Sequence, residues 1–139
     1  MATGKIENVV PNTIVSGNYT PDISYTGSGK TLTVENIDAK YFLFGGHVCV
    51  VSMRFNITNL GAHTNNENLL ISLPDNVKPA LNTTGPIGVY YTSNEVSNLV
   101  ARASTYGNGF LYITDGIGGG YSSNVITTGF QGLFAVIVF

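Results

Sequence analysis

The most informative hydrophobic pattern lies between residues 41 and 58, where two apolar-rich runs flank Gly45-Gly46. Glycine reaches the positive φ angles of tight turns without a steric penalty, so this pattern predicts a β-hairpin. In the second run, one face would carry Val48, Val50, Ser52 and Arg54, and the other would carry Cys49, Val51, Met53 and Phe55. Because both faces are mostly apolar, we expect a central strand that is covered on each side.

The rest of the chain repeats this short-strand pattern, with turn residues every eight to twelve positions and no helical period. A shift in the parity of apolar positions at Ile37 predicts a bulge or a strand end there. The glycine-rich segment from Asp115 to Asn124 is expected to be a loop. Further strands are predicted at residues 6–10, 13–15, 19–25, 31–37, 69–73, 87–92, 99–103, 110–114 and 133–139. This pattern is typical of an all-β, antiparallel, jelly-roll-like β-sandwich of about 8–10 strands.

The chain of 139 residues fits one domain of ordinary size. We assign residues 17–139 to a single sandwich head, and residues 1–16 to an N-terminal extension or a connection to a preceding shaft. The N-terminus lacks the basic start and apolar run of a secretory signal, which predicts synthesis in a cytoplasm.

The last seven residues, LFAVIVF, are all apolar. Such a run belongs in the middle of a sheet or against another subunit. A monomer of this size can cover one face of the strand. Coverage of both faces would require contact with other subunits, which favours an oligomer. The alternative is that this run is an ordinary central strand of a monomeric sandwich. The candidate interface residues are Leu133, Phe134, Val136, Val138 and Phe139.

Composition and charge narrow the range of partners. Only 10% of the residues are charged, the net charge is -2, and the six Lys and Arg residues are scattered. A nucleic-acid interface would need a basic stripe, so no nucleic-acid partner is expected. No apolar run approaches the ~18 residues of a membrane span, so no membrane insertion is expected either. Cys49, the single cysteine, lies in an apolar strand and is interpreted as a small buried hydrophobe.

No constellation of residues predicts catalysis, a metal site or a cofactor. The GSGKT sequence at residues 27–31 resembles the end of a phosphate-binding loop, but a Thr-rich strand follows it where that loop needs a helix. His47 and His63 have no partner at ligand spacing. The eight carboxylates include no pair that stands out as a glycosidase pair. We therefore expect a non-enzymatic protein without a cofactor.

Aromatic and amide side chains gather in the second half of the chain, on segments predicted to be loops. Tyrosine offers a flat apolar ring and a hydroxyl, and neighbouring Asn or Asp can satisfy ligand hydroxyls. Whether each tyrosine faces solvent or the core stays open. The candidate ligand-binding residues are Tyr90, Tyr91, Tyr106, Asn108, Asp115, Tyr121 and Asn124.

About half of the chain, residues 17–74, resembles the β-sandwich tip domains of bacteriophage tail fibres and related phage receptor-binding proteins. The motifs that carry the resemblance are Tyr19-Thr20-Pro21, Thr31 to Val34, Tyr41 to Phe44, Gly45-Gly46, Val48 to Val50 and Ser72-Leu73-Pro74. The resemblance implies a homotrimer at the tip of a viral fibre or spike, made in the host cytoplasm. It also implies that loops of the trimer bind a host-surface glycan or protein.

The closing GFQGLFAVIVF is also similar to the last strand of the trimeric jelly rolls of the tumour necrosis factor and complement-collagen families. A binding domain of that kind is one alternative. A structural virion decoration, which contacts only other virion proteins, is another. A small glycan hydrolase or esterase is a third, and it would need two carboxylates in one cleft.

Overall fold

The computed structural model describes residues 14–27, 32–62, 66–75, 77, 87–92, 99–104, 109–115, 120–122 and 126–139. Within this part of the chain, the regular structure consists of β-strands, which confirms the all-β class. The strands are β1 (Ile14–Asn18), β2 (Ile23–Tyr25), β3 (Thr33–Phe44), β4 (Val48–Asn59), β5 (Leu69–Ser72), β6 (Gly88–Thr92), β7 (Leu99–Ser104), β8 (Phe110–Asp115), β9 (Gly120–Tyr121) and β10 (Gly129–Val138).

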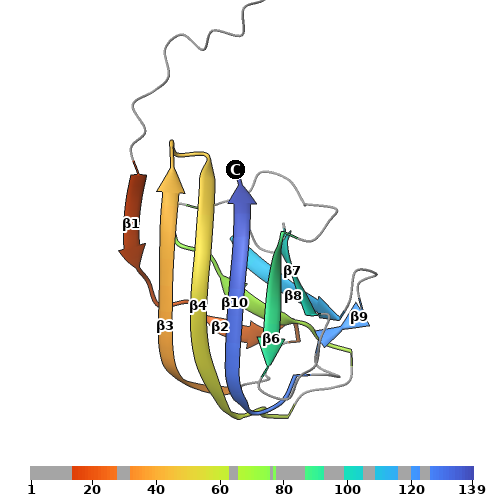
Figure 1. Ribbon diagram of the computed structural model, residues 1–139. Coiled ribbons are helices and arrows are strands. Elements are labelled where there is room, and N and C mark those ends of the chain that lie inside the picture. The colour runs from red at the N-terminus through yellow and green to blue at the C-terminus, as the bar shows by residue number, and fades with distance from the viewer. Residues whose placement is uncertain are drawn as a thin grey trace, which may run out of the picture.

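The strands form a rolled antiparallel sheet in the order β1-β3-β4-β10-β6-β7-β8-β5-β2, and β9 pairs with β8. The front layer holds β1, β3, β4, β10 and β6, and the sheet then turns through β7 and β8 into a back layer with β5 and β2 (Figure 1). This confirms a two-layer β-sandwich. The C-terminal strand β10 lies between β4 and β6, so it occupies the interior of the front layer.

The predicted hairpin is confirmed as β3 and β4, which pair over almost their full lengths. Gly45 and Gly46 have φ angles of 58° and 75°, and the His47 amide donates to the Phe44 carbonyl at 3.2 Å. The bulge expected near Ile37 is also present, as a register shift between Glu35 and Asp38 with Asn36 at a φ of 54°. The strand continues through this bulge, so the separate strands predicted at 31–37 and 41–44 are one strand.

The core lies between the two layers and is built from inward-facing side chains at alternating positions along the strands. In the front layer, Cys49, Val51, Met53 and Phe55 of β4 are buried, as their shared face predicted. From the back layer, β5 and β8 bring further buried side chains to the same core, namely Leu69, Ile71, Leu111 and Ile113.

Three details differ from the sequence-based expectations. Tyr19 to Asp22 form a connection between layers, so the strand predicted at 19–25 begins only at Ile23. The segment expected to be a loop at 115–124 contains β9, which pairs with the end of β8. Strand β1 crosses the boundary placed after residue 16, because Ile14 already pairs with Phe44. The strand predicted at 6–10 lies outside the described residues.

Candidate binding surface

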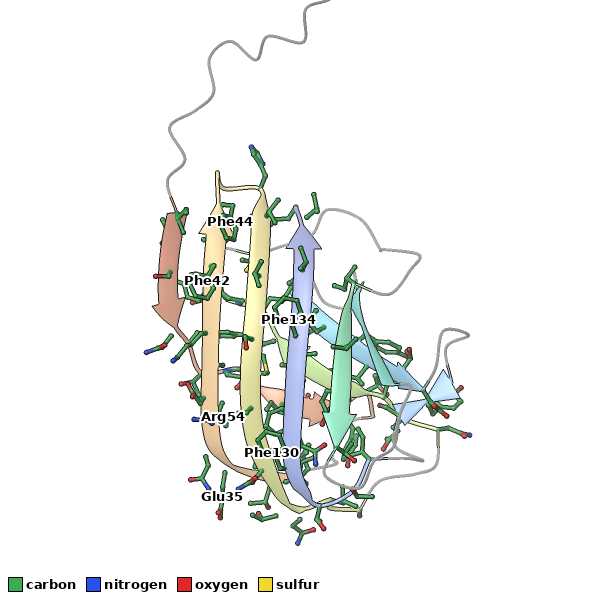
Figure 2. All side chains as sticks on the ribbon, viewed as in Figure 1. Glu35, Phe42, Phe44, Arg54, Phe130 and Phe134 are labelled. Atoms are coloured by element: carbon green, nitrogen blue, oxygen red, sulfur yellow. The ribbon has the colours of Figure 1, made fainter. Side chains whose placement is uncertain are left out.

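The outer side of the front layer carries a patch of exposed apolar side chains, which we call the apolar face. Its members project from β1, β3, β6 and β10, and their exposed fractions run from 38% at Val136 to 68% at Val138. Figure 2 shows Phe42, Phe44 and Phe134 on this side of the sheet. The apolar face consists of Ile14, Phe42, Phe44, Val89, Phe134, Val136 and Val138.

The strand register makes these residues neighbours across the sheet. On one rung Phe44 lies opposite Val48, which in turn lies opposite Val138. Two residues further along each strand, Phe42, Val50 and Val136 form the next rung. Cross-strand neighbours have Cβ atoms about 4.5–5.5 Å apart, so the patch is continuous. We expected both faces of β4 to be covered, but only the inner face is. On the outer face, Val48 and Val50 are half-buried.

The size of the apolar face is at the upper end for a protein that stays monomeric. Phe42, Phe44 and Phe134 are 39%, 41% and 49% exposed. At roughly 200 Å² for each phenylalanine, the three rings expose on the order of 250 Å². The four aliphatic members enlarge this toward the roughly 300–600 Å² of the largest patch on a typical monomer, which is often functional.

The opposite end of the same side is mixed: Phe130 is 39% exposed there (Figure 2), but charged side chains surround it and limit the extent of the apolar face. Asp38 and Arg54 lie on paired positions of β3 and β4 and form an ion pair at 3.2 Å. Glu35 lies at this end as well (Figure 2). Because both partners of the ion pair are well exposed, it contributes at most about 1 kcal/mol to stability. Charged side chains here favour solvent over a buried contact.

The five predicted interface residues do not all lie on one face, because alternate residues of β10 point to opposite sides of the sheet. Phe134, Val136 and Val138 lie on the apolar face. Leu133 is only 3% exposed and points into the core, so its assignment to an interface is wrong. Phe139 is half-buried and packs against the core. Sequence reasoning missed Phe42 and Phe44. The turn at Gly45-Gly46 sets them opposite Val48 and Val50, but only the pairing of β4 with β10 brings them onto one face with Val136 and Val138.

The assignment of Tyr90 to a ligand-binding loop is also wrong, because Tyr90 lies in β6 and is 2% exposed. Its hydroxyl donates to Oε1 of the buried Gln131 at 2.7 Å, and its ring lies 6.3 Å from that of Phe55. Gln131 Nε2 donates to the carbonyls of Thr127 and Gly129 at 2.8 and 3.0 Å. Burial raises the pKa of Tyr90 well above its ordinary value. Tyr90 is therefore a core residue with a structural hydrogen bond.

Two other candidate ligand residues come close together. Asp115 ends β8 and is half-buried, and Tyr121 lies in β9 and is exposed. Thr114 pairs with Tyr121, which places Asp115 and Tyr121 on adjacent rungs. The side chain of Tyr91, and the residues Tyr106, Asn108 and Asn124, lie outside the described part of the chain.

The described residues contain neither a group of three or more metal-ligating side chains nor a helix long and apolar enough to cross a membrane. The thiol of Cys49 is buried in the core, and burial raises its pKa to about 11. A thiol that stays protonated at neutral pH is a poor nucleophile and a poor metal ligand. Cys49 therefore serves as a core side chain.

The chain matches no protein-family model, no curated protein and no solved structure. Function is therefore inferred from the geometry of the described residues, together with the resemblance carried by residues 17–74.

Proposed function

We propose that this chain is a non-enzymatic binding head of a viral fibre or spike, which associates into a homotrimer through its apolar face and attaches to host-surface glycans or proteins. The single observation that supports the proposal best is the exposure of Phe42, Phe44 and Phe134 on the same face of the front layer. The number three comes from the resemblance of residues 17–74 to phage fibre tips.

Burial of the apolar face would supply the free energy for association. Removing about 250 Å² of phenylalanine surface from water contributes on the order of 6 kcal/mol for each protomer. Part of this is lost to the entropic cost of association, which is several kcal/mol. A standard interface buries about 800 Å² on each partner, so the apolar face would form its centre and the surrounding polar positions its rim.

Attachment by such a head would depend on multivalency. Three copies held on one particle make the second and third contacts with a cell intramolecular, which raises avidity without any new contact. Only 10% of the residues are charged, so attachment through hydroxyl and aromatic groups should vary little with salt.

The proposal is tested by light scattering of the full chain at micromolar concentration, before and after substitution of Phe134. The chain mass is 14.7 kDa, so a trimer is expected at three times 14.7, about 44 kDa. Phe134→Ser should reduce the mass to that of the monomer and should weaken adhesion to host cells. Tyr121→Ser removes an exposed aromatic residue elsewhere and should leave the mass unchanged. A wild-type mass near 15 kDa would overturn the trimer.

A further inference from the structure

A cleft opens at the side of the sandwich, between the inner face of the front layer near β1 and β3 and the back layer at the end of β5. Its volume is about 400 Å³, which falls in the range of small-molecule sites. One wall includes Tyr19 and Tyr41, and the other includes Leu73 and Pro74. The polar side chains around it are those of Asn18, Thr20, Asp22, Ser72 and Asp75.

Backbone hydrogen bonds hold the cleft open in a defined shape. The Tyr19 amide donates to the Ala39 carbonyl at 3.1 Å, which fixes the connection after β1 to the front layer. On the other side, the Asp22 amide donates to Ser72 Oγ at 2.8 Å and the Ser72 amide donates to the Asp22 carbonyl at 2.9 Å. The connection from Tyr19 to Asp22 is thus tied to both layers, and a ligand would meet a largely preformed site.

The aromatic wall owes its shape to Gly17. The Tyr41 ring lies so close to the Gly17 backbone that a Cβ added to Gly17 would stand 2.8 Å from the Tyr41 hydroxyl oxygen. Tyr19 meets Tyr41 edge to face, with ring centroids 6.0 Å apart and an interplanar angle of 74°. Tyr41 remains half-buried, so part of its ring faces the cleft.

The chemistry of the lining favours one class of ligand. Asp22 and Asp75 are exposed carboxylates, and the described lining residues include no lysine or arginine. Two carboxylates in one cleft are also what the hydrolase alternative requires, so hydrolysis of a bound glycoside would overturn the non-enzymatic assignment. An anionic ligand would be repelled, whereas the hydroxyls of a neutral sugar can donate to these carboxylates in charge-assisted hydrogen bonds. The tyrosine rings offer flat apolar surface for the C–H face of a sugar ring. Carboxylate, amide and hydroxyl groups beside tyrosine are the combination that a neutral carbohydrate needs.

We propose that the cleft between Tyr41 and Asp75 binds a neutral saccharide. This inference rests on the proposed attachment function and identifies its ligand class and its site. A second hollow of about 320 Å³ lies against the same segment, Ser72 to Asp75, and extends toward Gly109 and Phe110. A saccharide longer than one unit can therefore follow this segment from one hollow to the next.

The test is ligand-observed NMR of the full chain with millimolar methyl glycosides of glucose, galactose, mannose and N-acetylglucosamine. At least one neutral glycoside should bind, and 3′-sialyllactose, which carries a carboxylate, should not bind through the cleft. Asp22→Asn and Asp75→Asn should each weaken the bound glycoside about tenfold, the loss expected for one charge-assisted hydrogen bond. Because both residues are exposed, neither substitution should unfold the protein.

Glu35→Gln is the matched control, since Glu35 is an exposed carboxylate on β3 that lies outside the cleft. Asp115→Asn tests the other candidate position, at the end of β8. Binding that survives Asp22→Asn and Asp75→Asn but is lost in Asp115→Asn would overturn the cleft site and leave the attachment function standing. Failure of all four glycosides to bind, or binding of a lysine-rich peptide in their place, would overturn the saccharide assignment. Light scattering on the same samples reports the trimer independently, so the two proposals can fail separately.

Discussion

Replacement of Tyr90 by Phe removes one buried hydroxyl and keeps the aromatic ring. In the folded protein that hydroxyl donates to Gln131 Oε1 at 2.7 Å, and Gln131 is fully buried. The packing against Phe55 should survive, because only the oxygen is lost. The Gln131 acceptor would remain in the core without this donor.

The expected cost follows from that imbalance. A buried acceptor that loses its donor costs about 1–3 kcal/mol, more than the ~1 kcal/mol net value of an average hydrogen bond. The free energy of unfolding should therefore fall by about 1–3 kcal/mol. Urea denaturation followed by circular dichroism measures this as a lower midpoint with an unchanged slope.

Tyr121→Phe is the matched control, because Tyr121 is 44% exposed. An exposed hydroxyl should change stability by less than about 0.5 kcal/mol. If Tyr90→Phe is equally silent, the hydrogen bond to Gln131 does not stabilise the core and the reasoning is refuted. A loss of glycan binding without a loss of stability would instead return Tyr90 to the ligand-binding residues.

Three further predictions concern the core and its ionisable groups. Gly88→Ala should destabilise the fold by about 1–3 kcal/mol in urea denaturation, because its Cβ would lie 2.2 Å from the Phe134 carbonyl oxygen of β10; a silent substitution would show that β6 can move away. Cys49 should resist a thiol reagent until the protein unfolds, and labelling at the rate of a free thiol would contradict its burial. Burial raises the Cys49 pKa from 9.0 to about 11. As the pH rises, the thiol therefore ionises in the unfolded chain before it ionises in the folded protein. The contribution of the Cys49 thiol to the free energy of unfolding should be complete below pH 9 and should be lost as the pH rises to 11. Cys49→Ala should make the free energy of unfolding fall less steeply over this range. An unchanged pH profile in the variant would refute the prediction.

The sequence predicted the hairpin, the bulge near Ile37 and the inward face of β4, because each leaves a local signal. Gly45 and Gly46 mark the turn, and the 2-residue period distinguishes Cys49 from Val48. These features depend on neighbours in the chain, which a single sequence displays directly.

The surface could not be predicted in the same way, since it depends on which distant strands pair. Tyr90 was expected among the ligand-binding residues because nothing local shows that β6 lies beside β10, where the Tyr90 hydroxyl meets Gln131. Phe42 belongs to the apolar face only through its pairing partners. The cleft likewise joins Tyr41 to Asp75, which are far apart in sequence and are brought together by the crossing from one layer to the other.

Strands β1 and β2 end the sheet on its two sides, yet they are consecutive in the chain and only Tyr19 to Asp22 separate them. The two edges of the rolled sheet are therefore linked by this short connection, which is hydrogen-bonded to Ala39 and Ser72. Because β1 and β2 are not paired with each other, the layers can separate at these edges without loss of hydrogen bonds between strands. A molecule bound between Tyr41 and Asp75 would contact both layers at these edges, so ligand binding would raise the melting temperature of the whole sandwich.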